Sequence, residues 1–159
     1  MSDLKSIKNQ QIVLFSLDEP RYALYLSAVE RVVRAVEIIP LPKTPDIVLG
    51  VINFQGEIIP VIDIRKRFHL ASREIALEDQ FIIARTSKRF VVIVVDSVDG
   101  VYDLEQYQIT DAEETFPYTD YLSGIANIET NIVLINDLEK FLSLNEQNVL
   151  NEALSGDKE

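Results

Sequence analysis

Few side chains in this 159-residue sequence have the chemistry of a catalyst. The single histidine, His69, follows the basic run Arg65-Lys66-Arg67, where neighbouring positive charge disfavours its protonated form. A surface helical turn explains this histidine more simply than acid–base catalysis does. Four aspartates follow apolar runs or turns, where a carboxylate ordinarily accepts a hydrogen bond from a turn amide or a helix N-terminus: Asp63, Asp96, Asp99 and Asp137. An acid–base pair would need two of them to face one cleft, so we interpret them as local caps.

Other reactive constellations are missing from the sequence as well. There is no cysteine, hence no disulfide, no thiolate nucleophile and no zinc–thiolate site. Gly50 and Gly56 lack the Lys-Ser/Thr and the strand-to-helix context of a phosphate-binding loop. One histidine and scattered carboxylates do not predict a metal site. We therefore predict a non-enzymatic protein without cofactor or metal.

Composition restricts the partners further. A formal net charge of -11 argues against nucleic acid and anionic lipid, because phosphate neutralisation needs a basic surface. The longest apolar run is interrupted by Asp63 and Arg65, so we expect no direct membrane insertion. Residues 1–6 contain no apolar signal segment, and we expect a cytoplasmic protein.

Residues 50–64 carry the strongest local pattern, in which a polar turn separates two apolar runs. They predict a strand, a tight loop and a second strand. Gly56 is the natural position for a positive φ, and Asn53 is a residue type that tolerates turn conformations. Pro60 cannot donate a ladder hydrogen bond, which predicts that the second strand lies at a sheet edge or bends sharply.

The rest of the chain predicts mainly strands. Residues 27–36 fit a short helical turn followed by a strand, and Asn136 and Glu139 fit an N-cap and a reciprocal cap of a C-terminal helix. That helix extends or restarts beyond residue 145. Three hairpins are expected, over residues 11–17 with 21–26, 80–85 with 90–95, and 124–128 with 132–135. These elements indicate an all-β fold of small barrels with a C-terminal helix.

The stretch Gly50-Val51-Ile52-Asn53-Phe54-Gln55-Gly56-Glu57-Ile58-Ile59-Pro60-Val61-Ile62-Asp63 resembles the signature of CheW-like domains, which occur in bacterial chemotaxis coupling proteins and in their partner kinases. Every position fits except the usual Arg, which is Gln55. Residues 95–98, 121–126 and 135–138 are also similar to family elements. The resemblance implies two packed five-stranded, SH3-like barrels with a groove between them. We assign residues 1–9 to a flexible N-terminus, 10–144 to the CheW-like domain and 145–159 to a helical extension with a polar tail.

The resemblance also implies a function. It implies an adaptor that couples chemoreceptors to a CheA-type histidine kinase, in the cytoplasm at membrane-associated receptor arrays. The groove would receive the receptor's cytoplasmic tip, and the barrel ends would join the kinase's similar regulatory domain. A receptor-facing loop would comprise Asn53, Phe54, Gln55 and Gly56. Weaker candidates for partner contact are Glu30, Arg31, Arg65, Arg67 and Phe68.

Two departures from the family pattern leave alternatives open. Gln55 lacks the charge and the bidentate fork of Arg, and Val29-Glu30-Arg31 stands where many members have Val-x-Glu. Both changes favour a chemosensory pathway other than flagellar chemotaxis. The first alternative is therefore a scaffold of a non-flagellar pathway that binds the kinase but not a standard receptor. The second is a small-molecule-binding protein or small hydrolase that uses the inter-barrel groove.

Overall fold

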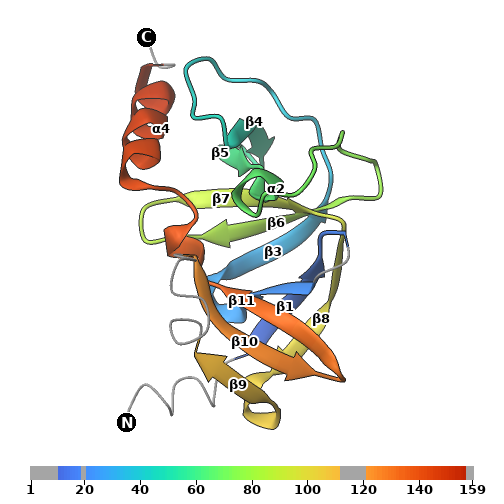
Figure 1. The fold of residues 1–159 in the computed structure, drawn as a ribbon. Helices are drawn as coiled ribbons and strands as arrows, with labels where there is room; N and C mark the ends of the chain where they lie inside the picture. Colours follow the sequence, from blue (N-terminus) through green and yellow to red (C-terminus); the bar gives the residue numbers. More distant parts are fainter. Residues whose placement is uncertain (1–10, 19–20, 112–120, 157–159) are drawn as a thin grey trace.

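Two sheets and a C-terminal helix make up the fold in the computed structural model, which describes residues 11–18, 21–111 and 121–156 (Figure 1). The first sheet contains β1 (Gln11–Ser16), β2 (Arg21–Tyr25), β8 (Ser97–Asp103), β9 (Gln108–Asp111), β10 (Leu122–Ile128) and β11 (Asn131–Asn136). The second sheet contains β3 (Val29–Arg34), β4 (Val48–Phe54), β5 (Glu57–Ile62), β6 (Gln80–Arg85) and β7 (Phe90–Val95). The helices are α2 (Ile64–Arg67) and α4 (Leu144–Gly156), with 3₁₀ turns η1 (Leu26–Ala28), η2 (Leu104–Gln106) and η3 (Leu138–Lys140).

Each sheet curls into a small barrel. The strand orders are β8-β1-β2-β11-β10-β9 and β3-β6-β7-β5-β4, and one parallel pair in each sheet (β11 with β2, β5 with β7) joins its hairpins. The second barrel closes where Ile39 and Val51 exchange two backbone hydrogen bonds of 2.8 and 2.9 Å. The expected pair of barrels and the three hairpins are confirmed. Within the described residues the sheet of the first barrel has six strands rather than five, with β8 and β9 at its two edges.

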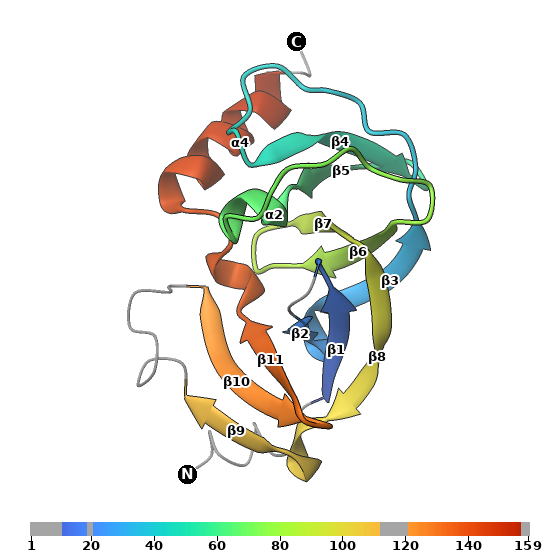
Figure 2. The ribbon, with the colours of Figure 1, turned by 45° about the vertical axis from the view of Figure 1, so that its right-hand side comes forward.

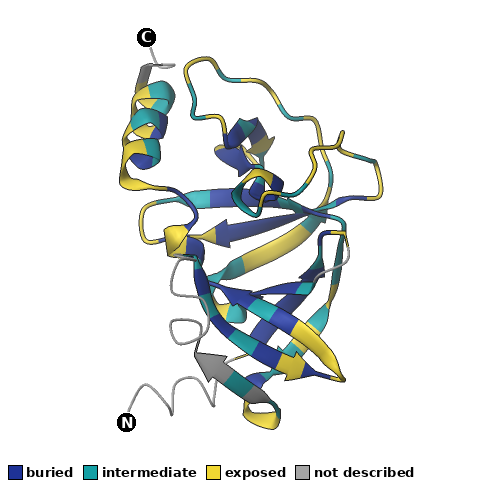
Figure 3. Cartoon of the chain, in the orientation of Figure 1, coloured by how far each residue is buried: buried dark blue, intermediate teal, exposed yellow. Residues whose placement is uncertain are grey.

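The core has three parts, one inside each barrel and one between them. Successive side chains of a strand point to opposite faces, so Phe81 and Ile83 of β6 face the interior of the second barrel while Ile82 and Ala84 face the first barrel. Strands β6 and β7 are therefore buried on both faces, as the apolar run of residues 90–95 predicts. Figure 3 shows this burial of β6 beside the largely exposed strand β3.

Pro60 is not on an edge strand, so the first of the two alternatives expected for this strand, an edge position or a sharp bend, is wrong. Strand β5 lies between β4 and β7, and Pro60 is buried opposite Val51. The parallel ladder with β7 begins only at Val61, one residue further on. The missing N–H of proline therefore falls just before the segment in which a donor is needed.

The C-terminal helical region begins differently from the expectation. Asn136 is the last residue of β11, and the cap is Asp137, whose Oδ1 accepts the Glu139 N–H at 3.0 Å. Glu139 does not reach back, because its carboxylate accepts the backbone N–H and the hydroxyl of Ser87. Helix α4 restarts at Leu144 and lies beside the second barrel in two views, with Leu150 fully buried in the inter-barrel core (Figures 1 and 2). The expected flexible residues 1–9 lie outside the described residues.

No helix in the described part of the chain is both long enough and apolar enough to cross a bilayer.

Candidate functional site

The family-like turn is a two-residue hairpin loop between β4 and β5. Gln55 and Gly56 both have positive φ, 51° and 88°, which is the hallmark of a type I′ turn. The side-chain oxygen of Asn53 accepts the Gly56 N–H at 3.0 Å. The positive φ expected at Gly56 is confirmed, whereas the positive φ at Gln55 was not expected from its residue type.

A pocket of about 170 Å³ lies beside this turn at the end of the second barrel. The guanidinium carbon of Arg31 lies 5.4 Å from the ring centroid of Phe54, within the range of a cation–π contact. The described lining residues all belong to the second barrel, and we call them the barrel-end surface: Glu30, Arg31, Phe54, Gln55, Glu57, Ile59, Ile83 and Phe90. The structure thus brings together two predicted segments, residues 30–31 and 54–55. Asn53 and Gly56 shape the turn without lining the pocket.

Three of the weaker candidates lie elsewhere. Arg67 Nη2 pairs with Glu146 of α4 at 2.7 Å, and the Phe68 ring stacks on Tyr22 with centroids 4.6 Å apart. Arg65 is only 8% exposed and is held by carboxylates. These side chains fasten parts of the fold together, so the structure does not place them on the barrel-end surface.

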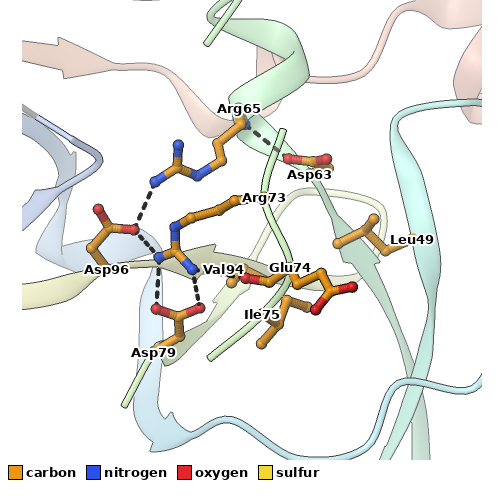
Figure 4. Close-up of a pocket in the computed structure, with 9 residues that line it drawn as sticks. All are labelled: Leu49, Asp63, Arg65, Arg73, Glu74, Ile75, Asp79, Val94 and Asp96. Carbon is orange, nitrogen blue, oxygen red and sulfur yellow. Dashed lines mark hydrogen bonds and ion pairs between the residues drawn. The ribbon is translucent and has the colours of Figure 1, made fainter. Parts of the chain in front are cut away.

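Arg65 belongs to a chain of alternating charges that we call the ion cluster. Its guanidinium donates to Asp18 of the β1–β2 turn at 2.9 and 3.1 Å and to Asp96, between β7 and β8, at 2.9 Å. Arg73 continues the chain by pairing with Asp96 and with Asp79, the latter at 2.7 and 2.9 Å (Figure 4). The ion cluster therefore ties both barrels to the loop that follows α2.

The surroundings of these carboxylates set their protonation. Burial alone would raise the pKa of Asp79, but hydrogen bonds from Arg73 and from the Ala76 N–H outweigh it, and the pKa is lowered. Burial likewise opposes ionisation of Asp96, yet the Asp18 N–H and two arginines lower its pKa. Both groups are therefore held as carboxylates.

A pocket of about 250 Å³ adjoins the ion cluster. Asp63 and Asp96 both line it (Figure 4). Asp63 Oδ1 caps α2 by accepting the Arg65 N–H at 3.1 Å, as predicted, and Asp96 is bound to two arginines. A general acid needs a raised pKa, and the lowered pKa of Asp96 is the opposite arrangement. Among the described residues no group of three His, Asp or Glu could hold a metal ion.

His69 lies directly after α2 and has a left-handed backbone, with φ of 60°. Its N–H donates to the carbonyl of Lys66 at 3.2 Å, and the Leu70 N–H donates to the carbonyl of Arg65 at 2.8 Å. These two bonds form a Schellman motif, whose left-handed position normally holds glycine. The exposed helical-turn interpretation of His69 agrees with this geometry.

Replacing His69 with glycine is expected to stabilise the protein by about 0.5–1 kcal/mol, because glycine adopts positive φ without strain. Urea unfolding of the wild type and His69→Gly measures the difference. The matched change His69→Ala keeps the strain and should give no gain. A loss of stability in His69→Gly would mean that the imidazole makes a stabilising contact.

A third pocket, of about 250 Å³, lies between the barrels. Strand β2, η1 and the end of β11 form one side, and β6 of the second barrel contributes Arg85. We call it the inter-barrel pocket, and its lining residues are Leu24, Tyr25, Ser27, Ala28, Arg85, Asn136, Asp137, Leu138 and Glu139. The sequence did not single out Tyr25, Ser27 or Arg85, since their proximity depends on how the barrels pack.

Two packed barrels with one pocket at a barrel end and another between the barrels define a β-barrel binding module. Residues 11–146 match the CheW-like domain, and the chain belongs to this family.

Similar proteins cover most of the chain. The chemotaxis protein CheW of Klebsiella aerogenes is 30% identical over 141 residues, which are 86% of this chain and 84% of that protein. CheW of Thermotoga maritima is 27% identical over 137 residues, which are 86% of this chain and 90% of that protein. The crystal structure of the scaffolding protein TtCheW from Thermoanaerobacter tengcongensis has a TM-score of 0.78 and 32% identity, and the match covers 87% of this chain and 95% of that one.

Proposed function

We propose that this protein is a non-enzymatic adaptor that holds chemoreceptors and a CheA-type histidine kinase together, so that receptor conformation biases kinase activity. The observation that carries the proposal is the match of residues 11–146 to the CheW-like domain. The names of the relatives, chemotaxis proteins and a scaffolding protein, support it. Asp79 and Asp96 support an adaptor over a hydrolase, because their pKa values are lowered whereas a general acid needs a raised pKa.

The geometry favours one surface for each partner. The family resemblance implies that a receptor tip enters the groove between the barrels and that barrel ends join the kinase. The inter-barrel pocket draws on both barrels, so we assign it to the receptor. The barrel-end surface draws on the second barrel, so we assign it to the kinase's regulatory domain. The alternative, in which residues 53–56 face the receptor, stays a prediction.

Calorimetric titration with the regulatory domain of a kinase from the same genome, and separately with the cytoplasmic tip of a chemoreceptor, tests the proposal. Micromolar or tighter binding to both supports the adaptor. Binding to the kinase alone supports the non-flagellar scaffold, which the loss of the usual Arg at Gln55 favours. Binding to neither contradicts the proposal and directs attention to small molecules.

Changing Arg31 to glutamate is expected to lower affinity for the kinase domain by about tenfold or more, because it reverses an exposed charge and removes the contact with Phe54. The control is Arg34→Glu, the same change on the same strand at an exposed position that does not line the pocket. Both variants should unfold at the same temperature as the wild type. Equal losses of affinity in the two variants would indicate a general charge effect.

The change Phe54→Asp tests the same surface less specifically, because Phe54 also packs against the core of the second barrel.

A further inference from the structure

The second barrel has another end, opposite the barrel-end surface, where the pocket beside the ion cluster lies. Leu49 lies near the start of β4 and Val94 near the end of β7. Phe54 and Phe90 of the barrel-end surface occupy the other ends of the same two strands. Leu49 and Val94 pack against the core of the second barrel, but they are only partly buried and line the pocket. An apolar wall is therefore open to a partner at this end.

The loop between α2 and β6 supplies two more apolar side chains, Ile75 and Leu77. Ile75 lines the same pocket, and Leu77 is 90% exposed (Figure 4). A turn fixes this part of the loop, because the Asp79 N–H donates to the carbonyl of Ala76 at 3.1 Å and the Ala76 N–H donates to Asp79 Oδ2 at 2.8 Å. Apolar side chains that a defined turn holds in water beside an apolar pocket mark an interaction surface. We call it the loop surface, and it comprises Leu49, Ile75, Leu77 and Val94.

Carboxylates surround the loop surface. Asp63 and Glu74 line the pocket, and the exposed Glu78 follows Leu77. Within the described residues none of these three carboxylates forms an ion pair. The two arginines that line the pocket already pair with aspartates of the ion cluster (Figure 4). The loop surface therefore favours a cationic partner, whereas a second copy of this chain, with its net charge of -11, or an anionic membrane would be repelled.

We propose that the loop surface binds a basic amphipathic segment of a partner protein. Apolar side chains of the segment pack on Ile75 and Leu77, and one lysine or arginine enters the pocket of about 250 Å³. The alkyl stem of that side chain lies on Leu49 and Val94, and its charged end pairs with the carboxylate of Glu74. This site goes beyond the proposed adaptor function, because none of these residues lines the barrel-end surface or the inter-barrel pocket.

The test is calorimetric titration with a synthetic amphipathic helical peptide of leucine and lysine. We expect Leu77→Ser to weaken peptide binding by about tenfold, because it removes the most exposed apolar contact. The control is Leu144→Ser, the same change at an exposed leucine of α4, which should leave the affinity unchanged. Glu74→Gln should weaken binding by about threefold, and Glu105→Gln, an exposed glutamate of the first barrel, should not. Leu77→Ser should still bind the kinase's regulatory domain as the wild type does, which separates this inference from the proposed function.

A measurement on the wild type locates the site directly. The methyl resonances of Leu49, Ile75 and Leu77 should shift in nuclear magnetic resonance spectra when the peptide is added. The inference is overturned if no peptide binds, or if a peptide of the same composition without helical segregation of its leucines binds equally well. Equally tight binding of cadaverine, a free alkyl diamine, would make the pocket a small-molecule site instead. A wild-type dimer that Leu77→Ser converts to a monomer would mean that a second copy of the chain covers this surface.

Discussion

Replacing Gly50 with alanine is expected to lower the free energy of unfolding by about 3 kcal/mol or more. A Cβ at this position would lie 2.4 Å from the carbonyl oxygen of Ile39 and 2.8 Å from Cγ2 of Ile38. The backbone φ is +152°, a value that side chains with a Cβ rarely adopt. Backbone atoms make the closest contact, so a change of side-chain rotamer cannot relieve it.

The effect should be large because Ile39 closes the second barrel. Its N–H and carbonyl both pair with Val51, next to Gly50, and a Cβ would push this bridge apart. Urea unfolding measures the loss, and the control is Gly56→Ala in the same hairpin. Gly56 has a φ of +88°, but a Cβ added there would meet no neighbouring atom. Gly56→Ala should therefore lower the free energy of unfolding only by the backbone strain of a positive φ, about 1–2 kcal/mol. Equal losses for the two variants would mean that the close approach of Ile39 is tolerated.

Replacing Arg65 with methionine is expected to lower the free energy of unfolding by about 3 kcal/mol. The change removes the positive charge that pairs with Asp18 and Asp96 at the junction of the barrels. The Arg65 side chain is 9% exposed, which limits the screening of these pairs by solvent. The control is Arg67→Met, which removes the pair with Glu146; Arg67 is 25% exposed, and the change should lower the free energy of unfolding by about 1 kcal/mol or less. Similar losses for the two variants would mean that Arg65 acts through packing of its aliphatic stem.

The ion cluster also gives a pH dependence. The pKa values of Asp79 and Asp96 are lowered in the folded protein, so their contribution is present above the unfolded value near 3.9 and is lost as the pH falls through the folded values. Urea unfolding between pH 7 and pH 2.5 should show this acid loss in the wild type. Arg65→Met should show a smaller loss, because Asp96 then has fewer partners that lower its pKa. Parallel pH profiles would mean that Arg65 does not contribute to the lowered pKa of Asp96.

Several local features of this protein could be predicted from its sequence. The positive φ at Gly56, the capping by Asp63 and Asp137, and the two-faced burial of residues 90–95 are confirmed. Each of the first three depends on contacts within a few residues, which residue type and spacing largely determine. The burial of residues 90–95 follows from their continuous apolar character.

Only the tertiary structure decided which distant groups meet. Arg65, predicted as a weaker candidate for partner contact, is buried, and Asp18 and Asp96 converge on it from the junction of the barrels. Asn136, expected as a helix cap, ends a strand and is buried, with its Nδ2 donating to the backbone carbonyl of Ala23 on β2. Pairing between strands far apart in the chain determines these neighbours, and no local pattern records which strands will pair. Sequence therefore determined the turns and caps, whereas long-range packing decided which side chains form the ion cluster and the candidate surfaces.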